Sequence, residues 1–302
     1  MRITVLCGGP SAEREISLIS GRAVASALRE AGHDVFVSDI APDNLAGLDH
    51  PADVIFPVLH GEFGESGELQ EILEQRGLVF VGSGSRASRL GMNKVETKIV
   101  WEKAGLPTPA YHVIQRGDPI PDIPDSCVVK AISSGSSIDV LLCRAPAELP
   151  AQARQAIETL LTRHEAVLVE QFIDGIELTV GLLQGLALPP IRIVPKREFF
   201  DYDAKYTASG TEHRFDTGLP EAVVVQCQEL ARRAYDVVGA RDLGRVDIML
   251  DAAHRPFLLE INTIPGFTPM SLLPEAAART GISFVQLVDR LANIAYNRGC
   301  DS

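Results

Sequence analysis

Apolar runs and amphipathic segments alternate along the first ninety residues. One amphipathic segment repeats apolar side chains at helical spacing and ends at Gly32, and residues 68–76 repeat them in the same way. The apolar stripe of the segment that ends at Gly32 is formed by Ile16, Ile19, Val24, Ala27 and Leu28. The apolar runs predict strands at residues 3–6, 33–40, 54–59 and 78–81. Strands separated by helices form parallel β-α-β units, so the pattern predicts a parallel α/β domain over residues 1–92.

The pattern changes twice in the rest of the chain. A predicted helix over residues 94–104 ends in a turn-rich break, and a central region then mixes strands with one helix. Its strands are expected at residues 111–114, 127–131, 140–143 and 167–172, and its helix at 151–163. A third region holds strands 178–183 and 191–194, a helix over 221–238, a hairpin of 244–250 with 257–262, and two terminal helices. We therefore predict a central subdomain over residues 93–176 and a C-terminal one over 177–302.

A long polar segment, residues 196–218, interrupts the third region. Structureless loops of this length are uncommon inside compact domains and are usually functional or disordered. Disordered segments are poor in aromatic residues. This one contains five of them, namely Phe199, Phe200, Tyr202, Tyr206 and Phe215. We therefore expect an ordered lid.

The composition is that of a folded enzyme of about two or three domains. The 302 residues are 46% hydrophobic and carry a net charge of −12, which disfavours general binding to nucleic acid. The five cysteines are scattered and form no C-x-x-C pair, so neither a disulfide framework nor a zinc site is expected. No secretory or membrane segment is apparent. A cytoplasmic enzyme without a membrane partner fits these features.

The hairpin carries the clearest candidate chemistry. Alternate residues of a strand share a face, so Arg245 and Asp247 point one way while Val246, Ile248 and Leu250 point the other. On the return strand Glu260 and Asn262 share a face, with Leu259 and Ile261 opposite. Carboxylate and amide oxygens are the ligands that hard divalent cations prefer. The alternative is a solvated sheet face with an ordinary Arg–Asp pair.

Three other segments carry groups suited to a nucleotide. Lys130 ends a strand and leads into a loop of small residues, which lets backbone N–H groups approach phosphates; a flexible surface loop has the same composition. Glu170 and Glu177 lie at a strand end. A carboxylate there is able to accept hydrogen bonds from ribose hydroxyls, and the backbone groups of the strand end are able to bind an adenine edge. The common alternative is that both acids are simply solvated. In the predicted lid, Lys205 and Tyr206 are candidates for phosphate and substrate contacts, unless the segment is simply an exposed loop.

A glycine turn opens the first predicted helix. Gly8 and Gly9 follow the first strand, and a glycine turn at a helix N-terminus is a general anion site. Glu13 is an unusual acid for a phosphate loop and suits an ammonium group better. Glu15 is explained by the favourable effect of an acid in the first turn of a helix.

The order of these segments resembles the D-alanine–D-alanine ligases of the ATP-grasp superfamily. The resemblance extends from residue 3 to about residue 290. The matching stretches are GGPSAEREISLISG, LHGEFGESGELQ, VGSGSRASRLGMNK, VVKAISSGSS, VLVEQFIDGIELTV, FFDYDAKY, GRVDIML and LLEINTIPGFTPMSLLP.

The resemblance implies a mixed α/β (α+β) ATP-grasp fold behind an N-terminal parallel α/β domain, with ATP between the central and C-terminal subdomains. The implied ATP-binding residues are Lys94, Lys130, Glu170, Gln171, Ile173, Glu177 and Lys205. The implied metal ligands, for Mg2+ or Mn2+, are Asp247, Glu260 and Asn262. The implied substrate-binding residues are Glu13, His60, Ser271 and Leu272. The implied catalytic residues are Glu13, Ser136, Tyr206, Arg245 and Gly266.

The implied reaction joins two D-alanines for peptidoglycan precursors, in the cytoplasm and in a homodimer. A carboxylate of the first D-alanine attacks the γ-phosphate of ATP, and the amine of the second attacks the resulting acylphosphate. A lid that excludes water protects such an intermediate. The metal and the lysines neutralise the charge of phosphoryl transfer.

The chain departs from the family pattern at four places near the predicted site. The departures are Ala131-Ile132, Ser133-Ser134-Gly135, Asp139 where glycine is common, and Met270 where histidine is frequent. They bear on the affinity for ATP and for the second substrate.

Three different functions are compatible with parts of this pattern. D-Alanine–D-lactate ligases tend to lack the lid tyrosine, so the presence of Tyr206 favours an amine nucleophile here. A ligase of the same fold that acts on different amino acids would share most of the motifs. A non-catalytic nucleotide-binding protein should have lost some of the four polar hairpin residues, and all four are present.

Overall fold

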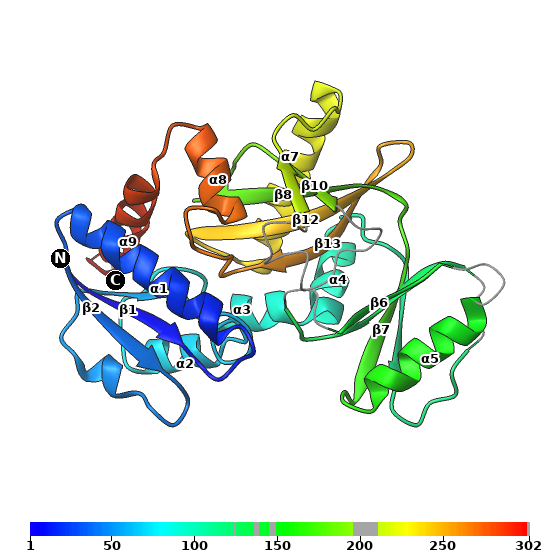
Figure 1. The fold of residues 1–302 in the computed structure, drawn as a ribbon, viewed down its shortest axis with the longest axis horizontal. Coiled ribbons are helices and arrows are strands. Elements are labelled where there is room, and N and C mark those ends of the chain that lie inside the picture. The colour runs from blue at the N-terminus through cyan, green and yellow to red at the C-terminus, as the bar shows by residue number, and fades with distance from the viewer. Residues whose placement is uncertain (122, 124, 136–138, 145–148, 196–210, 301–302) are drawn as a thin grey trace.

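The computed structural model describes residues 1–121, 123, 125–135, 139–144, 149–195 and 211–300. Three sheets organise these residues (Figure 1). The first is parallel, in the order β2-β1-β3, and is built with the helices α1 to α3 from the N-terminal residues. Its elements are β1 (Arg2–Gly8), α1 (Arg14–Glu30), β2 (Asp34–Ile40), a 3-10 turn (Ala46–Asp49), β3 (Val54–Pro57), α2 (Glu68–Gln75) and α3 (Ser85–Met92).

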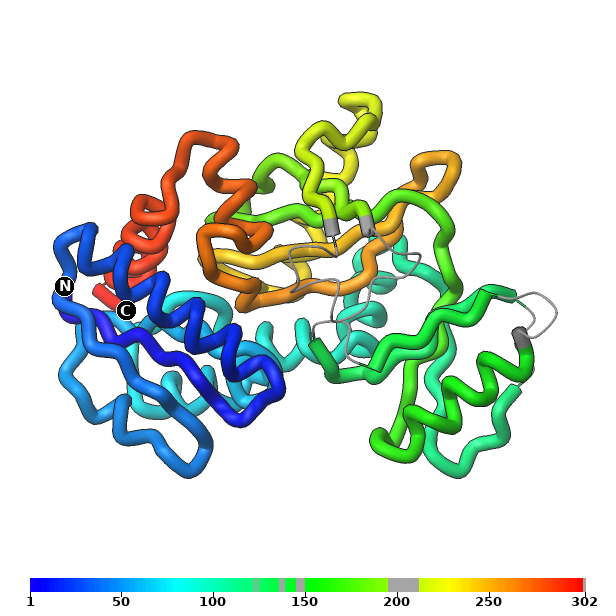
Figure 2. Tube along the Cα trace, viewed as in Figure 1, coloured from blue at the N-terminus to red at the C-terminus, as the bar shows by residue number. Residues whose placement is uncertain are grey.

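The central residues form a four-stranded antiparallel sheet in the order β4-β7-β5-β6. In Figure 2 this part extends away from both chain ends. One face of the sheet is covered by a helix whose buried side chains, such as Ile157 and Leu160, meet Val129 and Val167. The elements are α4 (Lys94–Lys103), β4 (Tyr111–Gln115), β5 (Cys127–Ala131), β6 (Val140–Cys143), α5 (Leu149–Leu161) and β7 (Ala166–Gln171).

The third sheet is antiparallel, in the order β11-β10-β8-β12-β13, and β9 pairs with β8. It lies between the other two sheets in Figure 1. Its elements are β8 (Gly175–Leu183), β9 (Leu186–Ala187), β10 (Ile191–Pro195), β11 (Thr211–Arg214), α7 (Glu221–Val238), β12 (Leu243–Asp251), β13 (Pro256–Asn262), α8 (Leu272–Arg279) and α9 (Phe284–Cys300). None of the described helices is long and apolar enough to cross a membrane.

Most predicted elements are present, and the exceptions have physical reasons. Residues 78–81 form only an isolated bridge between Phe80 and Ile55. The helix α3 was not predicted, because its apolar side chains are few. In the predicted lid, residues 211–214 form β11 against β10, so the prediction of an irregular segment is wrong there; residues 196–210 lie outside the described residues. Ile19 is 45% exposed and does not join the core.

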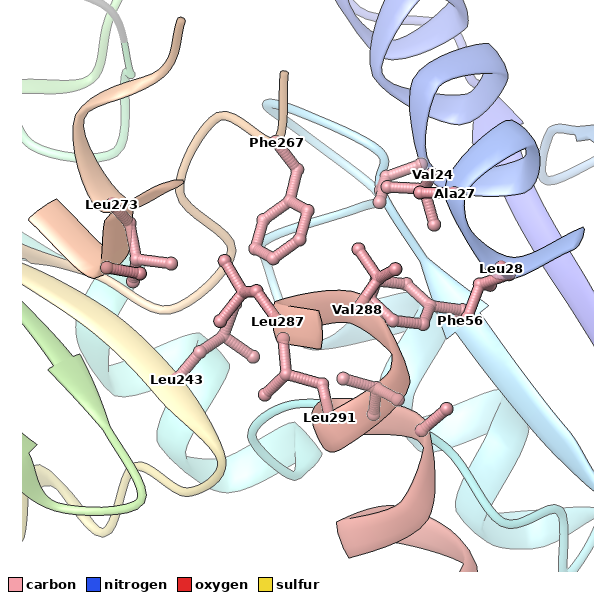
Figure 3. Close-up of a cluster of buried hydrophobic side chains, with 14 of the residues drawn as sticks. Val24, Ala27, Leu28, Phe56, Leu243, Phe267, Leu273, Leu287, Val288 and Leu291 are labelled. Carbon is pink, nitrogen blue, oxygen red and sulfur yellow. The ribbon is translucent and has the colours of Figure 1, made fainter. Parts of the chain in front are cut away.

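One hydrophobic core joins the two ends of the chain. The last helix, α9, packs on α1 and β3 of the N-terminal sheet. Figure 3 shows Leu287, Val288 and Leu291 of α9 between Val24 and Leu28 of α1 and residues of the C-terminal part. The C-terminal contribution includes Leu243, Phe267 and Leu273. The N-terminal sheet and the C-terminal part therefore hold a fixed relative position.

Truncating α9 in this core tests how much the junction contributes to stability. Leu291 is fully buried, so Leu291→Ala should lower the free energy of unfolding by about 2–5 kcal/mol, the usual cost of such a cavity. Urea unfolding measures the change. Asn297→Ala on the exposed side of the same helix is the control, with an expected change within about 0.5 kcal/mol. Equal effects of the two substitutions would contradict the role of this core.

Candidate active site

A cavity of about 360 Å³ lies where the N-terminal, central and C-terminal parts of the chain meet. Both polar and apolar side chains line it. Most of the predicted site residues that the structure describes are among them: Glu13, His60, Lys94, Glu177, Arg245, Asp247, Glu260, Asn262, Gly266, Ser271 and Leu272. Segments from nearly the whole length of the chain therefore contribute to one site.

The hairpin β12–β13 supplies the charged wall of the cavity. Arg245 pairs in register with Asn262, and Asp247 pairs with Glu260, so the four side chains share one face as predicted. Arg245 holds the Asp247 carboxylate with two hydrogen bonds, from Nε at 3.0 Å and from Nη2 at 2.8 Å. Thr179 of the neighbouring strand β8 donates to the same carboxylate at 2.6 Å. Asp247 is thus held in one orientation.

The opposite face of the hairpin is core, with one correction. Val246, Ile248 and Leu250 are fully buried. On the return strand the core residues are Leu258 and Ile261, and Leu259 is only half-buried. A bulge between Asp247 and Ile248 shifts the pairing, so strict alternation fails beyond it. The prediction that Leu259 packs on the core face is therefore not met.

Lys94 connects the small-residue loop to the hairpin. Its ammonium donates to the carbonyl oxygen of Ser134 at 2.5 Å and lies 3.5 Å from Oε2 of Glu260, although the side chain is only 6% exposed. Asn93 caps the helix α4 by accepting from the backbone N–H of Val95 and Glu96. The helix therefore begins at Lys94, directly after its cap, and this start places the ammonium in the cavity.

Glu13 forms the N-terminal wall together with the loop that follows β3. Gly8 and Gly9 have φ of +84° and +85°, which only glycine adopts without strain, and their turn brings the start of α1 to the sheet edge. Glu13 is 5% exposed. A Cβ atom on Gly135 would lie 3.3 Å from Oε2 of Glu13, so the small-residue loop approaches this carboxylate closely.

Glu65 is a site residue that was not predicted from the sequence. It lines the cavity, and its Oε1 lies 3.4 Å from Nδ1 of His60. Burial raises the pKa of the Glu65 carboxyl; the hydrogen bond from His60 lowers it, and the charge of Glu13 raises it further. Its place between two glycines in the stretch LHGEFGESGELQ was the available signal.

The far edge of the cavity is formed by the turn before α8. A Cβ atom on Gly266 would lie 3.1 Å from Oγ of Ser271, so the two predicted residues are adjacent. Oγ of Ser271 accepts from the backbone N–H of Thr268 at 3.0 Å. Met270 is 75% exposed beside them, and Ile19 of α1 also lines the cavity. An apolar rim thus borders this edge.

Lys130 and Glu170 lie away from the cavity lining, on adjacent strands of the central sheet. The Lys130 ammonium is 2.9 Å from Oε2 of Glu170, and a second lysine, Lys98 of α4, is 3.0 Å from the same oxygen. Lys98 was not predicted from the sequence, because a lysine in an amphipathic helix is normally exposed. The backbone N–H of Gln171 already donates to the carbonyl of Ala110, so this N–H is not available to a ligand.

Several predicted site residues lie outside the described residues or next to them. Ser136, Lys205 and Tyr206 lie outside the described residues. Asp139, where the family commonly has glycine, has a φ of 60°, a region that aspartate enters more easily than most residues. Its carboxylate lies 2.7 Å from Arg163 and 2.7 Å from His164. These two contacts hold the aspartate in a conformation that glycine adopts freely.

The donor set of the hairpin fits a hard divalent cation. Asp247 and Glu260 offer carboxylate oxygens from paired positions, and Asn262 offers an amide oxygen that also accepts from the backbone N–H of Ile264 at 3.0 Å. Across the described parts of the chain, no three His, Cys, Asp or Glu side chains gather as a metal cluster. The candidate site therefore rests on two carboxylates and one amide.

The three sheets, with charged residues of the hairpin facing one cavity, define an ATP-grasp ligase. Solved structures agree: the D-alanine–D-alanine ligase of Bacillus anthracis complexed with ATP aligns over 100% of this chain and 99% of its own, with a TM-score of 0.86 at 26% identity. The enzyme of Coxiella burnetii aligns over 100% and 95%, with a TM-score of 0.85 at 26% identity.

Sequence comparison identifies the family. The family model "D-ala D-ala ligase C-terminus" matches residues 100–293. The D-alanine–D-alanine ligase of Gloeobacter violaceus is 42% identical over 300 residues, covering 96% of this chain and 98% of the relative, and that of Burkholderia cenocepacia is 42% identical over 306 residues, covering 98% and 96%. The chain belongs to the D-alanine–D-alanine ligase family.

The buried lysine predicts a specific pH dependence of stability. Burial lowers the pKa of Lys98 to about 8 from 10.5, against the charge of Glu170, which raises it. Between these values the unfolded chain binds more protons than the folded chain at this group, so stability rises with pH. Relative to Lys98→Met, the free energy of unfolding of the native sequence should gain at most about 3 kcal/mol from pH 8 to pH 10.5.

Urea unfolding of both proteins at about pH 7.5, 9 and 10 measures this difference. Contributions from groups that do not interact with Lys98 cancel when the two curves are subtracted. A difference that does not change with pH would contradict the assigned pKa of Lys98.

Proposed function

We propose that this chain joins two D-alanines to D-alanyl-D-alanine at the expense of ATP, releasing ADP and phosphate, in the cavity that Glu13 and the hairpin face enclose. The observation that carries the proposal is that one cavity contains a carboxylate suited to an ammonium, a lysine and an oxygen-rich hairpin face. The family supports the same activity, since its named members are D-alanine–D-alanine ligases. The product serves peptidoglycan synthesis, and with it the cell wall and cell shape.

The first D-alanine binds through its ammonium at the N-terminal wall. Glu13 is almost fully buried and negatively charged, and His60 and Glu65 lie in the same wall. The carboxylate of this D-alanine is then directed towards Lys94 and the hairpin. Ser136 and Tyr206 complete a hydrogen-bonded link to Glu13 in this proposal.

ATP binds between the central subdomain, residues 93–176, and the C-terminal subdomain, residues 177–302. The N-terminal domain, residues 1–92, contributes the substrate-binding wall. The ATP-bound structure of the Bacillus anthracis enzyme supports ATP as the nucleotide. Glu170, the carbonyl of Gln171 and the backbone of Ile173 hold adenine, and Glu177 holds the ribose. Lys94, Lys130 and Lys205 contact the phosphates in this proposal, with Lys205 supplied by the predicted lid.

Asp247, Glu260 and Asn262 bind Mg2+, or Mn2+, in this proposal. When bound, the metal neutralises phosphate charge during phosphoryl transfer. The carboxylate of the first D-alanine attacks the γ-phosphorus, the bond to the β-phosphate oxygen breaks, and an acylphosphate and ADP result. Lys94 lies 3.5 Å from Glu260, which places its ammonium beside the proposed metal ligands.

The second D-alanine binds at the far edge, with its carboxylate on Ser271 and the backbone N–H of Leu272. Its amine attacks the acyl carbon, loses a proton, and phosphate leaves. Arg245 and the backbone of Gly266 stabilise the tetrahedral oxyanion. Because Arg245 is anchored on Asp247, its position is fixed before the charge develops.

The cellular setting of the proposal is a cytoplasmic homodimer that binds neither nucleic acid nor membranes. The net charge of −12 supports the absence of a nucleic-acid partner. The relatives named above join D-alanine to D-alanine, so a D-lactate-forming activity is not favoured.

Substrate dependence of phosphate release tests the proposed reaction. The purified protein with ATP and Mg2+ should release phosphate only when D-alanine is added, and the dipeptide should appear by mass spectrometry. L-Alanine should not replace D-alanine, because its ammonium and side chain exchange places relative to Glu13. Phosphate release with another amino acid but none with D-alanine would overturn the substrate while leaving the ligase class.

Removing one charge from the hairpin tests the metal ligands. Glu260→Gln should fold normally and lose about 100-fold or more in kcat, the scale seen when a transition-state contact is removed. Asp251→Asn is the matched control, because Asp251 lies at the other end of the same hairpin and pairs with exposed Arg255. Near-normal turnover of Glu260→Gln, with the fold verified by circular dichroism, would refute the metal assignment.

A further inference from the structure

Lys98 is a fully buried lysine that the proposed chemistry does not use. A buried ammonium is costly unless it is paired and hydrogen-bonded. Here it lies 3.0 Å from Oε2 of Glu170, donates to Oγ1 of Thr108, and lies 5.5 Å from the centroid of the Tyr111 ring. The partners come from two segments, the strand β7 and residues 108–111, which both meet this one ammonium.

Two ammonium groups meet the same oxygen of Glu170. Lys130 approaches Oε2 at 2.9 Å from β5, and Lys98 approaches it at 3.0 Å from α4. This oxygen is completely buried. Two cations on one oxygen hold this side of the carboxylate by charge, so the second oxygen, Oε1, is the one that is left to meet a ligand.

The contacts of Lys98 continue to the strand that carries the proposed metal ligands. Thr108 donates to the carbonyl of Leu258 in β13 at 2.9 Å. The N–H of Leu258 donates in turn to the carbonyl of Pro107 at 2.9 Å. The carboxylate of Glu170 is therefore positioned relative to the hairpin as well as to its own sheet.

We propose that Lys98 is a positioning residue for nucleobase selection, which fixes Glu170 so that Oε1 accepts a hydrogen bond from the exocyclic amine of adenine. The inference rests on the proposed function, which places adenine at Glu170. An ionised carboxylate only accepts hydrogen bonds. It therefore favours a 6-amino purine and repels a 6-oxo purine such as hypoxanthine.

Without the Lys98 charge, the carboxyl is held by Lys130 alone. It is then able to rotate, so Oε1 no longer has a fixed position from which to accept a hydrogen bond from the 6-amino group. The selectivity between the two purines should fall even if the protein remains stable.

Equilibrium binding of ADP and IDP tests the inference, because the two differ in the 6-amino and 6-oxo groups. Isothermal titration calorimetry with Mg2+ at neutral pH compares the native protein with Lys98→Met, Lys98→Arg and Lys103→Met. Lys103 is an exposed lysine of the same helix and serves as the control.

The native protein and Lys103→Met should prefer ADP over IDP by about tenfold or more, the factor given by about 1.4 kcal/mol. Lys98→Met should bind ADP at least about tenfold more weakly, with the ratio approaching one. Lys98→Arg, which keeps the charge, should retain most of the preference. The ratio of the two dissociation constants does not depend on the fraction of active protein. A merely structural role of Lys98 would change that fraction and leave the ratio unchanged.

A folded Lys98→Met protein with the native ratio would overturn the inference. If Lys98→Met does not fold, the neutral but polar Lys98→Gln takes its place with the same expected result and the same contrary one. Native protein that binds neither nucleotide would instead contradict the proposed function. Native protein that binds ADP and IDP equally would overturn the role of Glu170 and, with it, that of Lys98.

Discussion

The register between β12 and β13 is the constraint on which the site depends. A strand that slips by one residue turns every side chain to the other face. Here Val246, Ile248 and Leu258 are buried on one side, so slippage would bring charges into the core. The same hydrophobic pattern that stabilises the sheet therefore fixes the charged face that points into the cavity. Arg245 and Thr179 then lock the Asp247 carboxylate in place.

The shared core sets the distance between the two substrate-binding walls. Phe267 follows Gly266 directly and packs on Phe56 of β3, with ring centroids 5.8 Å apart. The backbone proposed to stabilise the oxyanion is thus attached to the N-terminal sheet that carries Glu13 through α1. The helix α9 fills the remaining space between these parts. The shared core therefore holds the distant segments of the site in a fixed geometry.

Local periodicity made much of the fold and the site predictable. The helix α7 has the predicted bounds, and the hairpin residues, Glu13 and Lys94 all line the cavity. The bulge in the hairpin was not predictable, because alternation carries no signal for an inserted residue. Lys98 and Glu65 were not predicted either, because their burial depends on packing between segments that the local pattern does not describe. The family resemblance supplied the residue roles.

A crystal structure with ADP, Mg2+ and D-alanyl-D-alanine tests the central claim most directly. We predict the dipeptide ammonium on Glu13, its carboxylate at Ser271, and the cation among Asp247, Glu260 and Asn262, with the adenine amine on Glu170. A dipeptide bound outside this cavity, or a cation held by other residues, would contradict this arrangement.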